Sequence, residues 1–421
     1  MKEITRERKN AKRLFSDIEG GDWMKGQMVN IVTEGKKAFD ACAMKMGRML
    51  AETILYMERE EMTGPDYHPI DPSRRKWASE QGSVFIGGHK VKVNRPRFRG
   101  PDGEMRLKSY GALQDPAQFS DELLAKALRG LSGRKYRETV LETAEGFGIS
   151  PSSVSRRLVQ ATARKIKEFM ERDLSSIDLF AIYLDTIHRG GVAFVVALGL
   201  DRYGKKWNLG FWEGATENHV LCQSLLSDLE SRGLKLSGNV LFITDGGSGI
   251  IKCLKERYGK ALLHQRCTIH KDRNIQDHLP KRYRKEAHRR YRRALELTHY
   301  SEAKKELMSF EKWLREINES SADSLLEALE EILTVHRLRV PKLLRKTLHS
   351  TNPIEASFSQ VRRAERNLLR YRGSKMSRRW LGSCLLYAET QFRRVKGYGS
   401  IPEVMENIER EHREETIKKA A

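Results

Sequence analysis

The run IDLFAIYLDTIHRGGVAFVVALGL, residues 177–200, decides the fold of this chain. It contains two apolar segments, each long enough for a buried strand, joined by the turn sequence TIHRGG. Short runs rich in Val, Ile, Phe and Tyr and bounded by glycine are typical of strands. A second turn, DRYG at 201–204, leads into KWNLGFWEG at 206–214. The sequence therefore predicts an antiparallel meander of three strands.

Helices and strands alternate after this meander. A helix is expected from Thr216 to about Arg232, where a glycine follows as its stop. NVLFITDGG, residues 239–247, indicates a buried strand, and a helix to Tyr258 and the strand ALLHQRC at 261–267 come next. This order of elements is the one expected of a ribonuclease H-like fold in the α/β class.

The remaining parts of the chain surround this core. Residues after about 272 show no convincing strand pattern, and several helices are expected there. The parts are a helical region and candidate dimerisation interface at 1–65, a small β unit with a linker at 66–118, a helix-turn-helix-like DNA-binding domain at 119–172, the first part of the core at 173–274, an all-α insertion at 275–345, and the completion of the core with C-terminal helices at 346–421. The apolar stripe of the first region, through Met46, Leu50, Ile54 and Met57, is most simply a packing or dimer face.

The helix-turn-helix prediction depends on two adjacent helical patterns. YRETVLETAEGFGI at 136–149 is closed by glycines, and the next helix has Ser150 as N-cap and Pro151 at its first position. One apolar face leaves polar side chains pointing outward, as in a helix that enters a major groove. An ordinary helical hairpin uses the same caps, so that alternative stays open. The side chains expected to contact DNA are Ser153, Ser155, Arg156 and Arg157.

Charge and composition restrict the partners and the compartment. Lys and Arg outnumber Asp and Glu by 78 to 56, a net charge of +22, which favours a polyanion such as double-stranded DNA. A basic protein without such a partner is the alternative. The longest apolar run, about Val192 to Leu200, is too short to span a bilayer, and MKEITRERKNAKRLF lacks the apolar core of a signal peptide. Five scattered cysteines suit a reducing compartment. We expect a cytoplasmic, nucleoid-associated protein with no membrane partner.

Three distant acids are the candidate catalytic residues. Asp185 ends the first predicted core strand, Asp245 ends the fourth, and Glu355 lies on a predicted helix beyond the insertion. In a ribonuclease H-like sheet the first and fourth strands are neighbours. Carboxylates at that place suit two Mg²⁺ ions about 3.5–4 Å apart, which promote attack on a phosphodiester and stabilise its leaving oxygen.

Each acid also has a purely structural interpretation. Asp185 could begin a hairpin turn, and Asp245 precedes Gly246 in a common turn dipeptide. Glu355 follows Asn352 by three residues, as the glutamate of a capping box does. Their joint position in one order of elements favours the catalytic interpretation.

HQRCTIHKDRN at 264–274 holds half of a zinc site. Cys267 and His270 are three residues apart, yet no second Cys or His pair follows at zinc-ligand spacing. Three interpretations remain: an element close to the active site in which His270 contacts DNA above a packed Cys267, a purely structural pair, and a zinc site.

Three strings together carry a resemblance to a known family. LFITDGG at 241–247, HQRCTIHKDRN at 264–274 and HSTNPIEASF at 349–358 resemble the mutator-like family of bacterial insertion-sequence transposases. The resemblance covers about 177–400 well and the N-terminal third by general layout. Its most specific parts are Gln-Arg-Cys-x-x-His-x-x-Arg-Asn and Thr-Asn-Pro-Ile-Glu.

The resemblance implies a DDE recombinase with Asp185, Asp245 and Glu355 as catalytic residues and metal ligands. It further implies two Mg²⁺ ions, with Mn²⁺ as a substitute, and terminal inverted repeats and target DNA as substrates. A homodimer is expected because two DNA ends have to be joined. The arginines expected to hold DNA are Arg266 and Arg273 beside the Cys-x-x-His pair, and Arg362, Arg363 and Arg366 after Glu355.

Two other functions fit the same residues. A metal-dependent nuclease would hydrolyse DNA without joining a 3′-hydroxyl end to a target. A non-catalytic DNA-binding regulator derived from a transposase would bind ends without cutting them, although the three intact acids argue against it.

Overall fold

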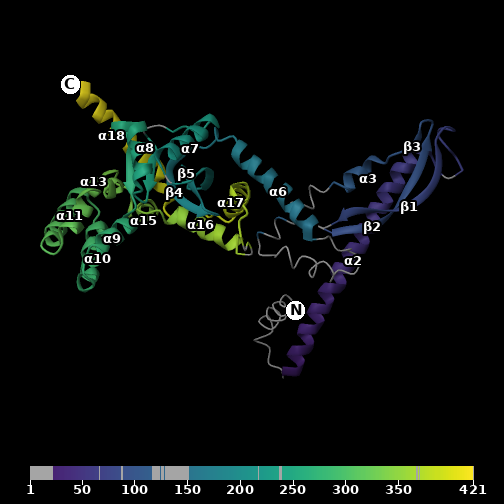
Figure 1. The fold of residues 1–421 in the computed structure, drawn as a ribbon, viewed down its shortest axis with the longest axis horizontal. Coiled ribbons are helices and arrows are strands. Elements are labelled where there is room, and N and C mark those ends of the chain that lie inside the picture. The colour runs from purple at the N-terminus through teal and green to yellow at the C-terminus, as the bar shows by residue number, and fades with distance from the viewer. Residues whose placement is uncertain are drawn as a thin grey trace. The chain divides into compact units, whose positions relative to one another are not determined.

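The computed structural model describes residues 22–65, 67–86, 89–115, 124, 128, 151–216, 218–236, 239–366, 368 and 370–420. The chain divides into two compact units, Met1–Ala161 and Thr162–Ala421. Figure 1 shows the elements of both units, each of which is described here by itself.

The first unit pairs a long helix with a small antiparallel sheet. Helix α2 covers Asp22–Thr63, and the sheet has the order β1-β2-β3. The strands are β1 (Arg75–Ile86), β2 (His89–Gly100) and β3 (Gly103–Met105), and the short helix α3 (Lys108–Leu113) follows. Ala51 and Leu55 of α2 are buried against Val84, Val93 and Phe98 of the sheet. The part of the chain expected to hold a small β unit, residues 66–118, thus contains these three strands.

The predicted stripe of α2 is not the face that packs on the sheet. Met46, Leu50 and Met57 are each more than 60% exposed and Ile54 is 39% exposed, whereas Ala51 and Leu55 are buried. The helix thus has two apolar faces, and within the described residues only one of them is covered.

Helix α6 (Pro151–Glu171) begins at the predicted proline. The preceding helix of the helix-turn-helix prediction, at 136–149, and Ser150 lie outside the described residues. The helix-turn-helix therefore stays a prediction.

The second unit contains a five-stranded mixed sheet. Its order is β6-β5-β4-β7-β8, in which β4, β5 and β6 are antiparallel while β7 and β8 run parallel to β4. The strands are β4 (Leu179–Arg189), β5 (Val192–Asp201), β6 (Lys206–Gly214), β7 (Leu241–Thr244) and β8 (Leu263–Arg266). The predicted meander and the two later strands are all present, and the chain is confirmed as a mixed α/β protein.

The turns of the meander follow from local chemistry. Gly190 and Gly191 have φ values of 59° and 77°, which L side chains rarely adopt, and they reverse the chain between β4 and β5. At the next turn the Asp201 carboxylate accepts the N–H groups of Tyr203 and Lys205. An aspartate side chain that accepts nearby backbone donors stabilises a tight turn.

Helices cover both faces of the sheet. Helices α7 (His219–Ser231) and α8 (Ser248–Tyr258) bury leucines and isoleucine against one face. On the other face α16 (Asn352–Ala364) contacts β4, and α17 (Ser374–Glu389) contacts β6. The predicted start of the α7 helix at Thr216 is wrong, because Asn218 caps it by accepting the N–H of Leu221.

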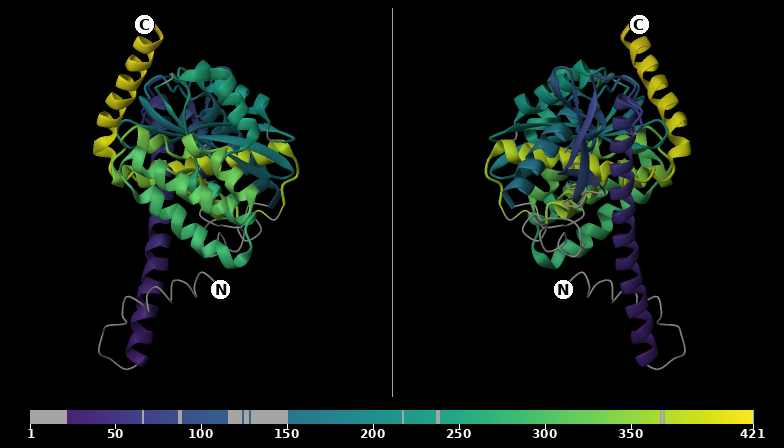
Figure 2. Two further views of the ribbon diagram at one scale, coloured as in Figure 1. Left: turned by 90° about the vertical axis from the view of Figure 1, so that its left-hand side faces the viewer. Right: turned by 90° about the vertical axis from the view of Figure 1, so that its right-hand side faces the viewer.

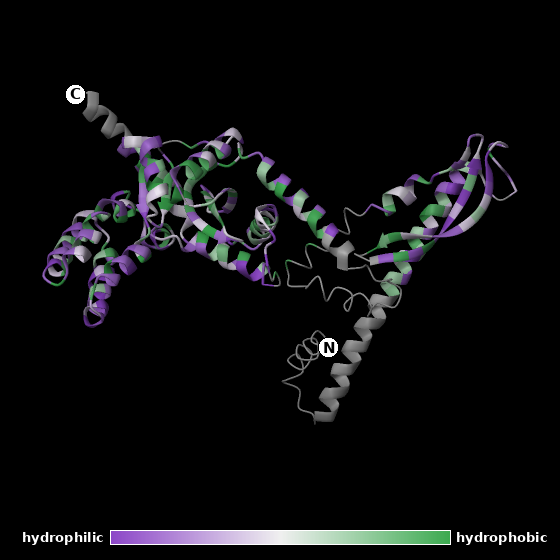
Figure 3. Cartoon of the chain, viewed as in Figure 1, coloured by the Kyte–Doolittle hydropathy of each residue, from purple (hydrophilic) through white to green (hydrophobic). Residues whose placement is uncertain are grey.

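Between β8 and α16 the described chain is helical, as predicted. The helices are α9 (Thr268–Asp277), α10 (Lys281–Glu296), α11 (Tyr300–Arg315), α12 (Glu319–Leu326), α13 (Leu329–Ile332), α14 (Thr334–Arg337) and α15 (Lys342–Leu348). They enclose a separate apolar core around Tyr291, Leu307 and Phe310. In Figure 3 hydrophilic colour predominates on these helices, while hydrophobic colour gathers in the central sheet.

The C-terminal helix α18 (Ile401–Ala420) begins with Ile401 and Val404 buried. Figure 2 shows α18, in yellow, at the outside of its unit in both views. Among the described residues, no helix is both long and apolar enough to cross a membrane.

Candidate active site

Two aspartates lie side by side where the parallel pairing of two neighbouring strands stops. The parallel pairing of β4 with β7 ends at Leu184 and Thr244, and Asp185 and Asp245 come directly after this pair. The even-numbered residues Ile182, Leu184 and Phe242 belong to the core under α7 and α8. Because successive side chains of a strand point to opposite faces, the two aspartates are assigned to the face that α16 covers.

Asp185 does not end its strand, and it does not begin a hairpin turn. Strand β4 continues to Arg189, and its pairing with β5 includes Asp185 opposite Val196. Only the pairing with the shorter β7 stops before Asp185. The expectations that Asp185 ends its strand and that it could begin a turn are therefore wrong. Its side chain lies where β4 extends beyond β7.

Asp245 shapes the turn that it precedes. Its Oδ1 accepts the N–H of Gly247 at 3.0 Å, and Gly246 has a φ of 106°. A substitution at Gly246 would strain this backbone and would place a Cβ 2.4 Å from Nε of Arg266. The turn thus fixes the aspartate at the end of β7.

Glu355 lies in the first turns of α16, but it is not part of a capping box. The helix begins at Asn352, so Thr351 is the N-cap, and its side chain makes no capping bond. The Thr351 hydroxyl instead donates to Oε1 of Glu355 at 2.9 Å. Helix α16 packs on β4 (Figure 1), and the charge of Glu355 acts on Asp185 of that strand.

The electrostatics of Asp185 show that the acids influence one another. Burial and, after it, the charges of Asp245 and Glu355 raise the pKa of Asp185, which is about 7 in the folded chain. The N–H of Thr186, which donates to Asp185 at 2.7 Å, and the neighbouring His270 act in the opposite direction. Residues 185, 245 and 355, far apart in sequence, therefore share one electrostatic site.

Cys267 and His270 lie next to Glu355. His270 Nε2 is 3.8 Å from Oε1 of Glu355, and Thr351 N–H donates to the Cys267 sulfur at 3.4 Å. Cys267 is fully buried, whereas the His270 side chain is 29% exposed. The structure thus brings the Cys-x-x-His pair to the site, with Cys267 beneath.

The same contacts perturb both side chains. The hydrogen bond with Cys267 raises the pKa of His270, burial lowers it, and the charges of Cys267, Glu355 and Asp245 raise it again. Burial raises the pKa of the Cys267 thiol, but hydrogen bonds from His270 and Thr351 outweigh burial and hold this pKa below its usual range. A cationic His270 next to Glu355 is favoured by this arrangement.

The donor chemistry of the three acids fits a hard cation. Asp185, Asp245 and Glu355 offer carboxylate oxygens, the ligands that Mg²⁺ prefers, and their mutual repulsion would be relieved by a bound cation. Within the described ranges, no group of three or more His, Cys, Asp or Glu side chains is already arranged as a metal site. Within the described residues, Cys267 and His270 thus have no further Cys or His grouped with them.

Arg266 does not contribute to an exposed DNA-binding surface. It is 6% exposed, its guanidinium lies 2.5 Å from Glu327, and it lies 3.7 Å from Glu331. Lys271, which is 1% exposed, joins the same network through Glu327 and Ser324. We therefore replace the expected DNA contact of Arg266 with a structural role: its ion pairs connect β8 with the helices that follow it.

The other arginines are exposed. Arg273 is exposed and lies three residues after His270, hence on the same side of α9. Arg362 and Arg363 are exposed in the last turn of α16, and Arg362 lies two turns along the helix from Glu355. Arg366 is exposed too, and it comes after the end of α16 at Ala364.

The predicted contacts of α6 can be described only in part. Arg156 is exposed on this helix. The side chains of Ser153, Ser155 and Arg157 lie outside the described residues.

Thr351 is the residue of the site that sequence reasoning missed. It is fully buried and bonds both Glu355 and Cys267. The sequence did contain a signal for the contact with Glu355: Thr351 comes four residues before it, and side chains at positions i and i+4 of a helix are neighbours. Nothing in the sequence indicated that the same hydroxyl also reaches Cys267.

The chain is similar in sequence to known proteins. The family described as "Transposase, Mutator family" matches residues 31–394. The transposase for insertion sequence element IS905 of Lactococcus lactis is 25% identical over 363 residues, covering 81% of this chain and 88% of that protein. The transposase for ISRM5 of Rhizobium meliloti is 26% identical over 330 residues, covering 75% and 80%. The transposase for IS256 in transposon Tn4001 of Staphylococcus aureus is 24% identical, covering 72% and 77%.

Proposed function

Because the chain belongs to the Mutator family of transposases, we propose that it binds the terminal inverted repeats of an insertion sequence, cleaves them and joins their 3′-hydroxyl ends to target DNA. The observation that carries this proposal is the shared site of Asp185, Asp245 and Glu355, in which the last two raise the pKa of the first. Such coupled carboxylates in a basic protein suit phosphoryl transfer on DNA.

The fold that we propose for the core is ribonuclease H-like. Support comes from the sheet order β6-β5-β4-β7-β8, with the three antiparallel strands first and the two parallel strands after them. Support also comes from the place of the acids, at adjacent strands and on the helix that returns after the insertion.

Mg²⁺ is the proposed cofactor, as two ions, with Mn²⁺ as a substitute. Asp185, Asp245 and Glu355 would hold them. When bound, such ions supply Lewis-acid stabilisation of the charge that develops in phosphodiester cleavage and transfer.

The chain's own residues have separate tasks in this proposal. The Thr351 hydroxyl restricts Glu355 by donating to one of its oxygens at 2.9 Å. His270, partly exposed and favoured as a cation, would contact a phosphate beside Glu355. Cys267 packs beneath His270, and its hydrogen bonds fix His270 and Thr351. A purely structural role for the Cys267–His270 pair predicts the same packing without the phosphate contact.

DNA binding is proposed to involve three surfaces of the chain. Helix α6 would act as the recognition helix of a helix-turn-helix through Ser153, Ser155, Arg156 and Arg157. Arg273 beside the site and Arg362, Arg363 and Arg366 beyond Glu355 would hold the backbone. The action of the protein on DNA would place it in the cytoplasm, at the nucleoid.

The acting species is proposed to be a homodimer formed through α2. Exposed side chains recur along this helix at Cys42, Met46, Met49, Thr53 and Tyr56, a spacing of four and three residues. Leu50 and Met57 flank them, and Met46, Met49, Leu50 and Met57 are each at least 60% exposed. A repeat of this period that is apolar except at Thr53 fits another helix with the same repeat, as in a coiled coil. A second copy supplies that helix, and two copies suit two DNA ends.

The test supplies the full-length protein with duplexes that carry its own element ends, a target plasmid and Mg²⁺. Wild type should cleave the ends and join them to the plasmid. Asp245→Asn should bind the ends and do neither, whereas Asp178→Asn, which changes one carboxylate of an exposed ion pair with Arg202, should behave as wild type. Cleavage without joining would favour a nuclease that only hydrolyses. Binding without any cleavage by wild type would favour a regulator.

A further inference from the structure

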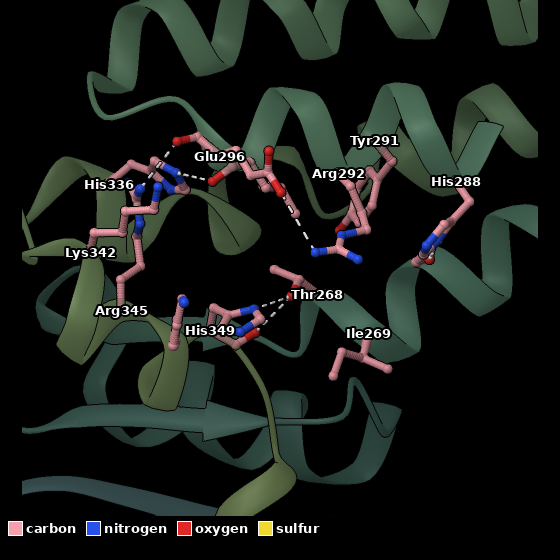
Figure 4. Close-up of a pocket in the computed structure, with 13 residues that line it drawn as sticks. Thr268, Ile269, His288, Tyr291, Arg292, Glu296, His336, Lys342, Arg345 and His349 are labelled. Atoms are coloured by element: carbon pink, nitrogen blue, oxygen red, sulfur yellow. Dashed lines mark hydrogen bonds and ion pairs between the residues drawn. The ribbon is translucent and has the colours of Figure 1, made fainter. Parts of the chain in front are cut away.

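A second site lies within the all-helical segment. A cavity of about 600 Å³ opens between α9, α10, α14 and α15. Its volume is in the range of small-molecule and cofactor sites. Thr268, Ile269 and Asp272 contribute to it from one side of α9, whereas His270 projects from the other side. The cavity is therefore distinct from the carboxylate site, and Figure 4 shows the side chains that surround it.

The cavity contains a buried charge without a counter-ion. Arg345 is 6% exposed, and its guanidinium donates only to main-chain oxygens, those of Leu297 at 2.9 Å and Glu296 at 3.4 Å. No carboxylate of the described chain lies within ion-pair distance of it. A buried cation that lacks an anionic partner is costly. This cost is offset if an anion enters the cavity.

Two further cations stand at the edge of the cavity. Lys342 and Lys346 are exposed and one turn apart on α15, on either side of Arg345 in sequence. The carboxylates that line the cavity are already engaged. Glu296 lies 3.5 Å from Arg292, and Asp272 lies 2.5 Å from His288. The free positive charge is thus concentrated around Arg345, as recognition of a phosphate requires.

The lining of the cavity also includes apolar side chains and two polar atoms without a partner. Ile269 and Leu295 contribute apolar surface. The hydroxyl of Tyr291 and Nδ1 of His336 are buried, and within the described chain neither has a hydrogen-bond partner. Tyr291 is 1% and His336 is 3% exposed, so water has little access to either. Such atoms suit a flat ring with polar groups at its edge.

We propose that this cavity binds one nucleotide, with its phosphate at Arg345, Lys342 and Lys346 and its base against Tyr291 and Leu295. A base that is stacked in a duplex cannot enter a cavity of this size. The nucleotide is therefore either an unstacked unit of a single strand or a free nucleotide. Of these two ligands, only the unstacked nucleotide of a DNA strand rests on the proposed function.

The experiment uses the full-length protein in EDTA, so that binding is measured apart from cleavage. One arm titrates deoxyadenosine monophosphate by calorimetry. The other titrates a short single-stranded oligodeoxynucleotide with one 2-aminopurine, whose fluorescence rises when the base unstacks. The pocket variants are Lys342→Ala with Lys346→Ala, and Tyr291→Phe. The matched control is Lys305→Ala with Lys312→Ala, two exposed lysines of α11 outside the cavity.

Wild type should bind at least one probe, and the arm that responds identifies the source. Loss of both pocket lysines should weaken binding about tenfold or more. Tyr291→Phe should weaken it several-fold without lowering the melting temperature, because a hydroxyl without a partner adds nothing to folding. The control pair should bind as wild type does.

The proposal is overturned if neither probe binds, if Tyr291→Phe and the lysine pair leave binding unchanged, or if both lysine pairs weaken it equally. These outcomes leave the proposed transposase function intact, because that function is tested by metal-dependent cleavage and joining at the carboxylates. Conversely, a wild-type protein that fails to cleave can still bind the monophosphate in the cavity.

Discussion

The hydroxyl of Thr351 donates to Oε1 of Glu355 at 2.9 Å, and it does so from a fully buried position that also contacts Cys267. One side chain therefore connects the carboxylate on α16 with the segment between β8 and α9. The orientation of Glu355 depends on this connection, which is the basis of the first prediction.

Thr351→Val should lower the rate of end cleavage by about 10- to 100-fold, because the isosteric side chain keeps the packing but cannot hold Glu355. Thr351→Ser should retain most of the rate, since it keeps the hydroxyl. Single-turnover cleavage at saturating Mg²⁺ measures both. Equal rates for Val and wild type would show that the hydrogen bond has no part in positioning.

Substitutions of Arg266 and Arg273 should have different effects: the first on the stability of the fold, the second on DNA binding. Arg266→Met removes a buried charge from Glu327 and Glu331 and should lower the free energy of unfolding by about 1–3 kcal/mol, while DNA affinity of the folded protein stays the same. Arg273→Ala should leave unfolding unchanged and reduce the dependence of log affinity on log salt by about one. Urea unfolding and fluorescence anisotropy at several salt concentrations provide the two measurements.

His336 should make the chain sensitive to acid. Burial and, after it, the charge of the neighbouring Arg345 lower the pKa of His336 to about 4, while the pKa in the unfolded chain is near 6.5. The unfolded state then binds more protons between these values, so stability is complete above pH 6.5 and falls as the pH drops toward 4. The loss attributed to this group is on the order of 3 kcal/mol.

The check on this prediction is a series of urea unfolding curves from pH 7 to pH 4. His336→Gln retains a side-chain donor for the carbonyl of Leu295, which His336 Nε2 contacts at 3.1 Å, but it does not titrate. The variant should show a flatter decline than wild type. Parallel curves for the two proteins would assign the acid sensitivity elsewhere.

Leu50→Glu on α2 should convert the dimer to a monomer, because it places a charge in the exposed apolar stripe opposite the face that packs on the sheet. Leu343→Glu is the matched control, since Leu343 is also exposed but lies in the second unit. Sedimentation equilibrium gives the mass of each. A wild-type monomer, or an unchanged dimer for Leu50→Glu, would contradict the proposed interface.

The place of the two aspartates could be predicted because each directly follows a run of residues that is typical of a strand. Runs of β-branched and aromatic residues indicated β4 and β7. The pairing of these strands then brings together the aspartates that follow Leu184 and Thr244. Other features depend on contacts between distant segments. Arg266 looks like any basic residue until the insertion brings Glu327 to it, and Arg366 follows a helix whose end at Ala364 has no glycine or proline to mark it. The Cys267–Thr351 contact joins segments 84 residues apart.

The most direct test of the account is the anomalous scattering of Mn²⁺ in crystals of the protein bound to its element ends. We predict manganese peaks within ligand distance of carboxylate oxygens of Asp185, Asp245 and Glu355, and their loss in crystals of Asp245→Asn. Manganese bound elsewhere, or peaks that persist unchanged in Asp245→Asn, would contradict the assignment of the three acids to one catalytic centre.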